Sequence, residues 1–212
     1  MAVNISILNA TGKLDKYILL LENKIQYSLG KIRDFFTIDN IDITVTPFRK
    51  GDESPSGIGG YSLSPHRVEL LLDCDRDDLD EVIKNELTAV LAHEIHHSIR
   101  TGLGIDSETL GQQLITEGMA CHFEMAVNGG RIPSLFDNLK GYDWRILLEL
   151  MKPLLNEKHH SVNKYFLGSD PDIFPKYAGY WVGFNLIQLY INKYQTSEYE
   201  LACMESERFY NI

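Results

Sequence analysis

Cysteine is scarce in this sequence, and basic residues are outnumbered by acidic ones. The three cysteines, at positions 74, 121 and 203, are odd in number and irregularly spaced, so they indicate no disulfide framework. Reduced thiols in a cytoplasmic protein are the simplest expectation. The chain has 20 lysine and arginine residues against 30 acidic residues, a net charge of −10. Proteins that neutralise nucleic-acid phosphates usually show the opposite balance, so we expect no nucleic-acid partner.

Long apolar runs are also missing. The longest, such as residues 17–21, fall far short of the ~20 apolar residues that span a bilayer. The first residues lack the basic segment and the following apolar segment of a secretory signal. We therefore expect a cytoplasmic protein with no membrane partner, and the sequence leaves its oligomeric state open. Its 44% hydrophobic and 24% charged residues are ordinary globular values, and 212 residues suit a single domain over 1–212.

The spacing of apolar residues indicates a few strands followed by several helices. Alternation and short apolar runs predict strands, whereas apolar residues three or four positions apart predict helices. This order is typical of an α+β protein, here with a helix-and-sheet part over 1–75 and a helical part over 76–212. The expected strands are 3–8, 41–46, 60–63 and 67–72, and the expected helices are 14–36, 77–100, 107–127, 143–156 and 174–194.

The helix expected over 77–100 contains an HExxH motif formed by His93, Glu94 and His97. At about 100° per residue, the two histidines lie about 40° apart and one turn along the helix, so both imidazoles can reach one ion. Neutral imidazole is a good zinc ligand. Glu94 lies about 100° round from His93, which suits a base acting on water better than it suits a ligand.

The context of the motif bears on whether it is accidental. A shuffled chain of this composition would contain the pattern roughly 0.016 times, so the bare motif is moderately specific. The apolar residues of the same helix fall on the side opposite the histidines, so we expect the helix to pack on a core by one side and present the histidines on the other. The alternative is a solvated helix with incidental histidines, in a helical module that binds no metal.

Two histidines leave zinc short of ligands, because catalytic sites usually use three protein ligands. Glu117 lies 20 residues after His97, in the middle of the next expected helix, which is reached through a glycine-containing turn. Antiparallel helices joined in this way can bring Glu117 beside His97, and the small residues Gly118 and Ala120 leave room for close approach. The alternative is an ordinary exposed glutamate.

These residues resemble the gluzincin group of zinc metallopeptidases. The more specific likeness is to an uncharacterised bacterial family of predicted zinc-dependent proteases. It rests on three segments and covers most of the chain from about residue 41. Those segments are Ala-His-Glu-Ile-His-His-Ser-Ile-Arg at 92–100, Glu-Gly-Met-Ala-Cys-His-Phe at 117–123 and Gly-Tyr-Trp-Val-Gly-Phe at 179–184.

The resemblance implies a zincin-like fold. Such a fold has a small twisted, mostly antiparallel sheet, with the HExxH helix beneath it and the third ligand on a following helix. The chain departs from thermolysin-like gluzincins at one position. Those proteins carry an acidic residue four positions after the glutamate ligand, where this chain has Cys121, so the contacts that support the ligands must be built differently.

Further residues have weaker claims to a site. Arg100 lies on the histidine side of its helix and could neutralise Glu117 or bind a substrate carboxylate, or could simply be a cation near a helix C-terminus. Tyr180, and after it Tyr177, could donate to the oxyanion of a transition state, or both could be aromatic core residues. The zincin resemblance also suggests that residues 59–62, with Gly60 and Tyr61, form an edge strand to which an extended peptide adds.

The sequence thus predicts a zinc metallopeptidase with one Zn²⁺ per chain. His93, His97 and Glu117 are the expected ligands, Glu94 is the expected base, and the substrate is a peptide or an unfolded protein. The alternative is a catalytically silent zincin-like domain that binds peptides or a partner protein. The intact Glu94 argues against it, because a domain that only binds has no need of a base.

Overall fold

The computed structural model describes residues 3–49, 54, 56–105 and 107–210. Two compact units make up the chain. The first comprises Met1–Leu103 and Ala126–Gly130, and the second comprises Gly104–Met125 and Arg131–Ile212. The sheet and the HExxH helix belong to the first unit. The expectation of a single domain stays a prediction.

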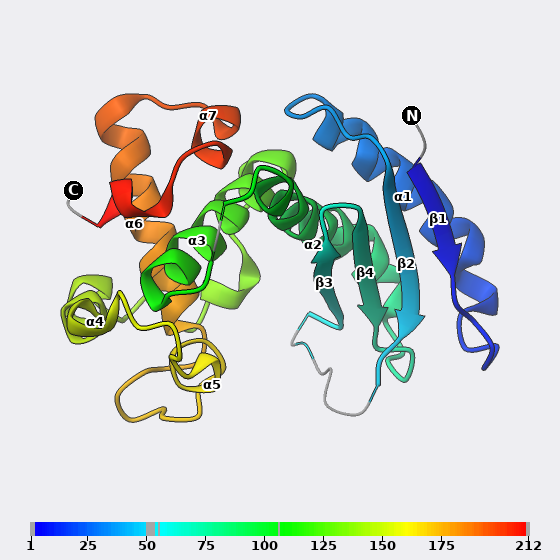
Figure 1. The fold of residues 1–212 in the computed structure, drawn as a ribbon. Helices are drawn as coiled ribbons and strands as arrows, with labels where there is room; N and C mark the ends of the chain where they lie inside the picture. The colour runs from blue at the N-terminus through cyan, green and yellow to red at the C-terminus, as the bar shows by residue number, and fades with distance from the viewer. Residues whose placement is uncertain (1–2, 50–53, 55, 106, 211–212) are drawn as a thin grey trace. The chain divides into compact units, whose positions relative to one another are not determined.

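The first unit is built on a four-stranded sheet with the strand order β1-β2-β4-β3 (Figure 1). The pairs β1–β2 and β2–β4 are parallel, and β3–β4 is antiparallel. Both β1 and β3 are therefore edge strands. The strands are β1 (Val3–Ile7), β2 (Ile41–Pro47), β3 (Ile58–Ser64) and β4 (Arg67–Leu72).

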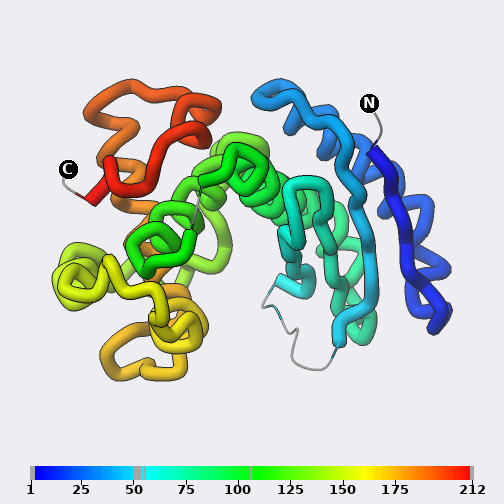
Figure 2. The backbone as a smooth tube through the Cα atoms, viewed as in Figure 1, coloured from blue at the N-terminus to red at the C-terminus, as the bar shows by residue number. Residues whose placement is uncertain are grey.

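The α+β class is confirmed, but the expectation of a mostly antiparallel sheet is wrong. The sheet is mixed and mostly parallel because helix α1 (Ile18–Arg33) carries the chain back from the end of β1 to the start of β2, as the backbone tube shows (Figure 2). Parallel strands need such a crossover connection. Only the short connection between β3 and β4, at residues 65–66, makes an antiparallel pair. The zincin-like assignment stays a prediction.

Helices α1 and α2 (Leu79–Gly102) lie together on one face of the sheet (Figure 1). The helix expected over 14–36 begins with a 3-10 turn at Asp15–Tyr17 and continues as α1. A buried hydrogen bond of 2.9 Å between the hydroxyls of Ser28 and Thr88 links α1 to α2. The buried apolar residues of α1 have the helical spacing that the sequence shows, and they are Leu21, Ile25, Leu29 and Ile32, all 0% exposed.

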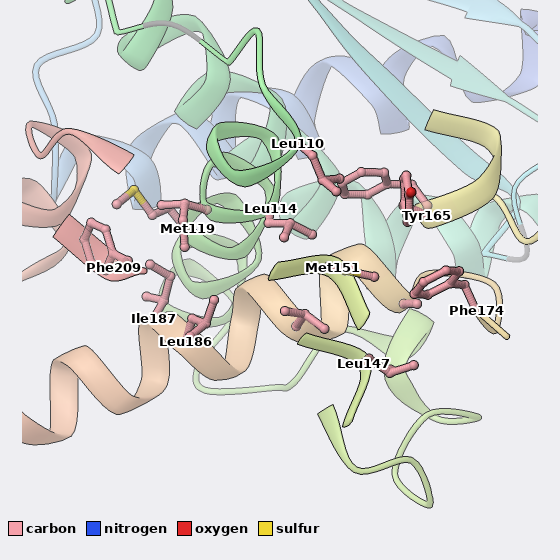
Figure 3. Close-up of a cluster of buried hydrophobic side chains, with 14 of the residues drawn as sticks. Leu110, Leu114, Met119, Leu147, Met151, Tyr165, Phe174, Leu186, Ile187 and Phe209 are labelled. Atoms are coloured by element: carbon pink, nitrogen blue, oxygen red, sulfur yellow. The ribbon is translucent and has the colours of Figure 1, made fainter. Parts of the chain in front are cut away.

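The second unit is helical. Its two long helices are α3 (Leu110–Val127) and α6 (Ala178–Tyr194), and between them lies α4 (Trp144–Met151). Two short helices that the sequence pattern does not reveal are α5 (Val162–Tyr165) and α7 (Glu198–Ala202). Their side chains enclose one apolar cluster (Figure 3), which includes Leu110, Leu114, Met119, Leu147, Met151, Leu186, Ile187 and Phe209.

Helices α3 and α6 touch backbone to backbone at two glycines. A Cβ atom on Gly118 would lie 2.8 Å from the backbone nitrogen of Phe184, and closer still to the backbone of Gly183. A Cβ atom on Gly183 would collide with the carbonyl group of Leu114. The sequence analysis expected Gly118 to leave room for close approach, and the structure shows that α6 is the helix that approaches there. This contact fixes how α3, which carries Glu117, lies on α6.

None of the helices in the described part of the chain is long and apolar enough to cross a membrane.

Candidate metal centre

Helix α2 carries the HExxH motif and is buried over most of its surface. Asp80 and Glu81 in its first turn complement the positive end of the helix dipole. Of its 24 residues, 14 are buried. The expectation of one buried side and one open side is therefore too simple, because His96 is 0% exposed and its ring meets Phe36 edge-on with the ring centres 6.5 Å apart. A helix held on several sides is a rigid support for a site.

His93 and His97 lie side by side on α2. Their ring centroids are 4.8 Å apart and their planes are inclined at 77°. His93 is 9% exposed and His97 is partly buried. The pairing that the spacing predicted is confirmed, because residues four apart on a helix are neighbours. Two imidazoles held in this way can serve as two ligands of one ion.

Glu94 points toward β3, the edge strand beside α2. A Cβ atom on Gly60 would lie 2.9 Å from Oε1 and 3.0 Å from Cδ of Glu94, and closer still to Cγ. The carboxylate thus rests against the backbone of the edge strand, and Glu94 is 8% exposed. Gly60 was expected in an edge strand, which is confirmed. Its contact with Glu94 was not foreseen, because nothing in the sequence links positions 34 residues apart.

A second link joins β3 to α2 one helical turn further along. The hydroxyl groups of Ser62 and Ser98 lie 2.9 Å apart, and the Ser98 hydroxyl also donates to the carbonyl oxygen of Ser64 at 3.2 Å. Ser98 is 2% exposed. Sequence reasoning missed this pair. The only available signal was a serine directly after His97 and another two residues after Gly60.

Glu117 lies on α3, one residue before the glycine that touches α6. Together with His93 and His97, it forms a group of side chains that could hold one metal ion. Two imidazoles and one carboxylate are the donor set of many catalytic zinc sites, which leave a further position for water or substrate. By donor chemistry, these residues fit zinc.

A second candidate group consists of His93, Cys121 and Glu124. Cys121 and Glu124 follow Glu117 by four and seven residues, so all three lie on one side of α3. Cys121 is 0% exposed and belongs to an apolar cluster with Phe136. The second group uses only one histidine of the motif, so the first group is the better zinc site. Spacing from Glu117 would have revealed Glu124.

The two candidate oxyanion donors lie at the start of α6. The rings of Tyr177 and Tyr180 meet edge-on with centroids 5.9 Å apart, and Tyr180 also meets Phe166 edge-on at 5.4 Å. Both tyrosines are partly buried. Tyr177 has a φ of +70°, an unusual conformation for a residue other than glycine. The packing agrees with an aromatic core role, and the role of oxyanion donor stays a prediction.

The remaining two predicted residues lie in the first unit. Tyr61 is 46% exposed on β3 and pairs with Glu69 of β4. Arg100 is 1% exposed, so its side chain is enclosed by the protein. A role for either residue in binding substrate stays a prediction.

An HExxH helix followed by a helix that carries a glutamate is the arrangement that the resemblance to zinc metallopeptidases implies. The family model described as predicted Zn-dependent protease (DUF2268) matches residues 21–211, and the chain belongs to this family. The resemblance to a family of predicted zinc-dependent proteases is thereby confirmed, and it extends further toward the N-terminus than the motifs indicated. The assignment to the gluzincin group stays a prediction. No curated protein and no solved structure matches the chain.

Proposed function

We propose that this protein is a peptidase in which His93, His97 and Glu117 hold one zinc ion per chain and Glu94 is the general base. The observation that carries the proposal is the pair of adjacent imidazoles on α2, with the Glu94 carboxylate held against the edge strand β3. Membership in a family of predicted zinc-dependent proteases supports it. The proposed substrate is a peptide or an unfolded protein.

When bound, zinc would supply a Lewis acid that polarises the substrate carbonyl and lowers the pKa of a water molecule. Glu94 accepts a proton from the attacking water as its oxygen bonds to the carbonyl carbon. Glu94 then donates this proton to the amide nitrogen as the C–N bond breaks, which gives a carboxylic acid and an amine. A carboxylate that is not itself a ligand is suited to carry the proton in both directions.

The edge strand provides a place for an extended substrate. Among the residues that the structure describes, β3 pairs with β4 alone, so its other side offers backbone groups to a peptide of any sequence. Gly60 and Tyr61 would face such a peptide. We propose Tyr180, and after it Tyr177, as the donor to the oxyanion. A cytoplasmic location stays a prediction from the cysteine usage.

The test is cleavage of a broad fluorogenic peptide library, with the zinc content measured on each sample. Glu94→Gln keeps nearly the same side-chain volume and both histidines, so zinc should remain bound. Because the proton acceptor is lost, turnover should fall roughly 10²–10⁴-fold. If wild-type protein with a full zinc complement cleaves nothing, the peptidase proposal is wrong. The alternative, a domain that binds peptides without cleaving them, is then favoured.

The ligands are tested in the same samples by competition with a chromophoric chelator. His93→Ala, His97→Ala and Glu117→Ala should each lower zinc affinity by several kcal/mol, because water is a poor replacement for a lost ligand. His159→Ala is the matched control, since His159 is an exposed histidine outside the motif. Equal losses in the control and in His97→Ala would show that the ligand set is wrong.

A further inference from the structure

Strand β3 and helix α2 lie side by side, and the contacts between them recur at matching intervals. Gly60 lies against Glu94, and the next contact pairs Ser62 with Ser98. Two residues of strand rise about 6.6 Å and four residues of helix rise about 6.0 Å, so successive contacts meet without strain. Two residues along the strand therefore correspond to about one turn of the helix. The alignment of β3 with α2 that places Ser62 beside Ser98 also places Gly60 beside Glu94.

Position 60 is restricted by space. The backbone of Gly60 does not have positive φ, so its conformation does not require glycine. A Cβ atom there would overlap Cγ of Glu94 and lie 2.9 Å from Oε1. At the neighbouring Gly59, the nearest atom to a Cβ would be the Cβ of Ser54, at 4.0 Å. The two adjacent glycines thus differ sharply in what a methyl group would meet.

The overlap involves an atom that cannot move alone. The position of Cγ is set by χ1 of Glu94, so any change that frees the space moves the whole carboxylate to another rotamer. His93 and His97 do not need to move, because the contact at Gly60 is made by the Glu94 side chain. A methyl group at position 60 would therefore displace the base while leaving the imidazole pair in place.

We propose that Gly60 is a positioning residue for Glu94: by lacking a side chain, it provides the space that holds the carboxylate against β3. This inference rests on the proposed function, because it concerns the base of that reaction. The Ser62–Ser98 hydrogen bond maintains the register in which the space faces Glu94.

The first test needs no activity. It is a double-mutant cycle of unfolding equilibria with Gly60→Ala and Glu94→Ala, measured by denaturant titration. Gly60→Ala should raise the unfolding equilibrium constant roughly tenfold when Glu94 is present. It should change that constant less than about twofold in the Glu94→Ala background, where Cγ and the carboxylate are gone. Gly59→Ala should show no dependence on Glu94.

If Gly60→Ala fails to fold but the double variant folds, the same coupling is demonstrated. Equal effects of Gly60→Ala in both backgrounds would overturn the inference, because the methyl group would then conflict with something other than Glu94.

The second test compares kcat, KM and zinc content. A displacement of a catalytic group by about 1 Å can cost 10²-fold in rate, so Gly60→Ala should lower kcat about 10–100-fold. KM should change less than about threefold, and one zinc per chain should remain. A merely structural role would instead lower the folded fraction and leave the kcat of the folded protein unchanged. Gly30→Ala, on an exposed part of α1, is the control for kcat.

The outcomes separate the two proposals. If wild-type protein holds zinc and cleaves nothing, the proposed peptidase function is wrong. The proposed role of Gly60 in positioning a catalytic base is then wrong as well, whatever the double-mutant cycle shows. A wild-type protein that cleaves, with Gly60→Ala equal to it in kcat, overturns the positioning role alone. Loss of kcat with retained zinc, together with coupling in the cycle, supports both.

Discussion

His122 shows how burial alone can fix the charge of a side chain near the proposed ligands. It is 1% exposed, and its ring stacks on Phe184 with centroids 4.1 Å apart. Its Nε2–H group donates to the carbonyl oxygen of Phe184 at 2.9 Å. Burial lowers the pKa of His122 to about 4, and the hydrogen bond to Phe184 offsets only part of that effect. His122 is therefore neutral in the folded protein at neutral pH.

This neutral histidine makes stability depend on pH in a defined window. Between pH 6.5 and about 4, the unfolded chain binds a proton at His122 and the folded chain does not, so the free energy of unfolding falls as the pH falls. The loss should reach on the order of 3 kcal/mol. His122→Gln cannot titrate but keeps an N–H donor. Denaturant titrations at pH 7 and pH 4.5 should show a smaller loss for the variant, and equal losses would contradict the assignment.

Tyr180→Phe distinguishes an oxyanion donor from an aromatic core residue at the start of α6. If the hydroxyl group donates to the oxyanion, its loss should lower kcat about 10²–10³-fold with little change in KM. Tyr177→Phe is the matched comparison, because the two rings meet edge-on at the start of one helix. A Tyr180→Phe variant with the kcat of wild type would assign the residue to the apolar core.

At the scale of single residues, the sequence revealed the contacts that depend on local spacing and few others. His93 and His97 could be paired because a helix brings residues four apart together. The contact of Gly60 with Glu94 and the bond of Ser62 with Ser98 join residues 34 and 36 positions apart. Such contacts depend on which strand lies beside the helix, which periodicity does not contain. The burial of His96 and Arg100 escaped prediction for the same reason.

Among the elements, the crossing of α3 and α6 gives the clearest expectation. Gly118→Ala and Gly183→Ala would each place a methyl group against backbone atoms that cannot rotate away. Each should lower the free energy of unfolding by about 3 kcal/mol or more, at the upper end for overpacked sites. The measurement is denaturant titration monitored by circular dichroism.

Gly30→Ala provides the control for helix propensity. Gly30 is an exposed residue of α1, and nothing lies within 4 Å of a Cβ atom placed on it. Alanine there should stabilise the protein by about 0.5–1 kcal/mol. If all three substitutions had the same sign, the close approach of α3 and α6 would not be what requires glycine.

The strands and long helices were predictable from their patterns, but the pairing of the strands was not. The pattern over 67–72 gave β4 with its observed bounds, and the spacing over 14–36 gave α1 with its preceding turn. The direction of β1 and β2 depends on α1 serving as a crossover, which a list of elements does not state. The four-residue helix α5 has too few turns to show any period.

For the whole molecule, zinc should act as a stabilising ligand. A metal that binds the folded chain alone raises the free energy of unfolding by about 2.7 kcal/mol at a concentration 100 times Kd. For a chain of this size, that corresponds to an increase in melting temperature of roughly 5–10 °C. The increase should appear on adding zinc to chelator-treated protein and should be reversed by chelator.

Two variants make this expectation specific. Glu94→Gln should keep the full increase, because the residue is proposed as base and not as ligand, whereas His93→Ala should lose most of it. Scanning calorimetry on both variants checks the assignment, and equal increases in wild type and His93→Ala would show that zinc acts elsewhere on the chain.

The space that Glu94 occupies beside Gly60 also has an evolutionary consequence. Relatives that keep glutamate at the position of Glu94 should keep glycine at the position of Gly60, because a larger residue would displace the carboxylate. Relatives in which that glutamate has been replaced by a small residue are released from the constraint and should admit alanine or serine there. Position 59 should vary independently of position 94. The two positions should therefore covary across the family, so a relative's residue at position 60 should indicate whether it has kept its base.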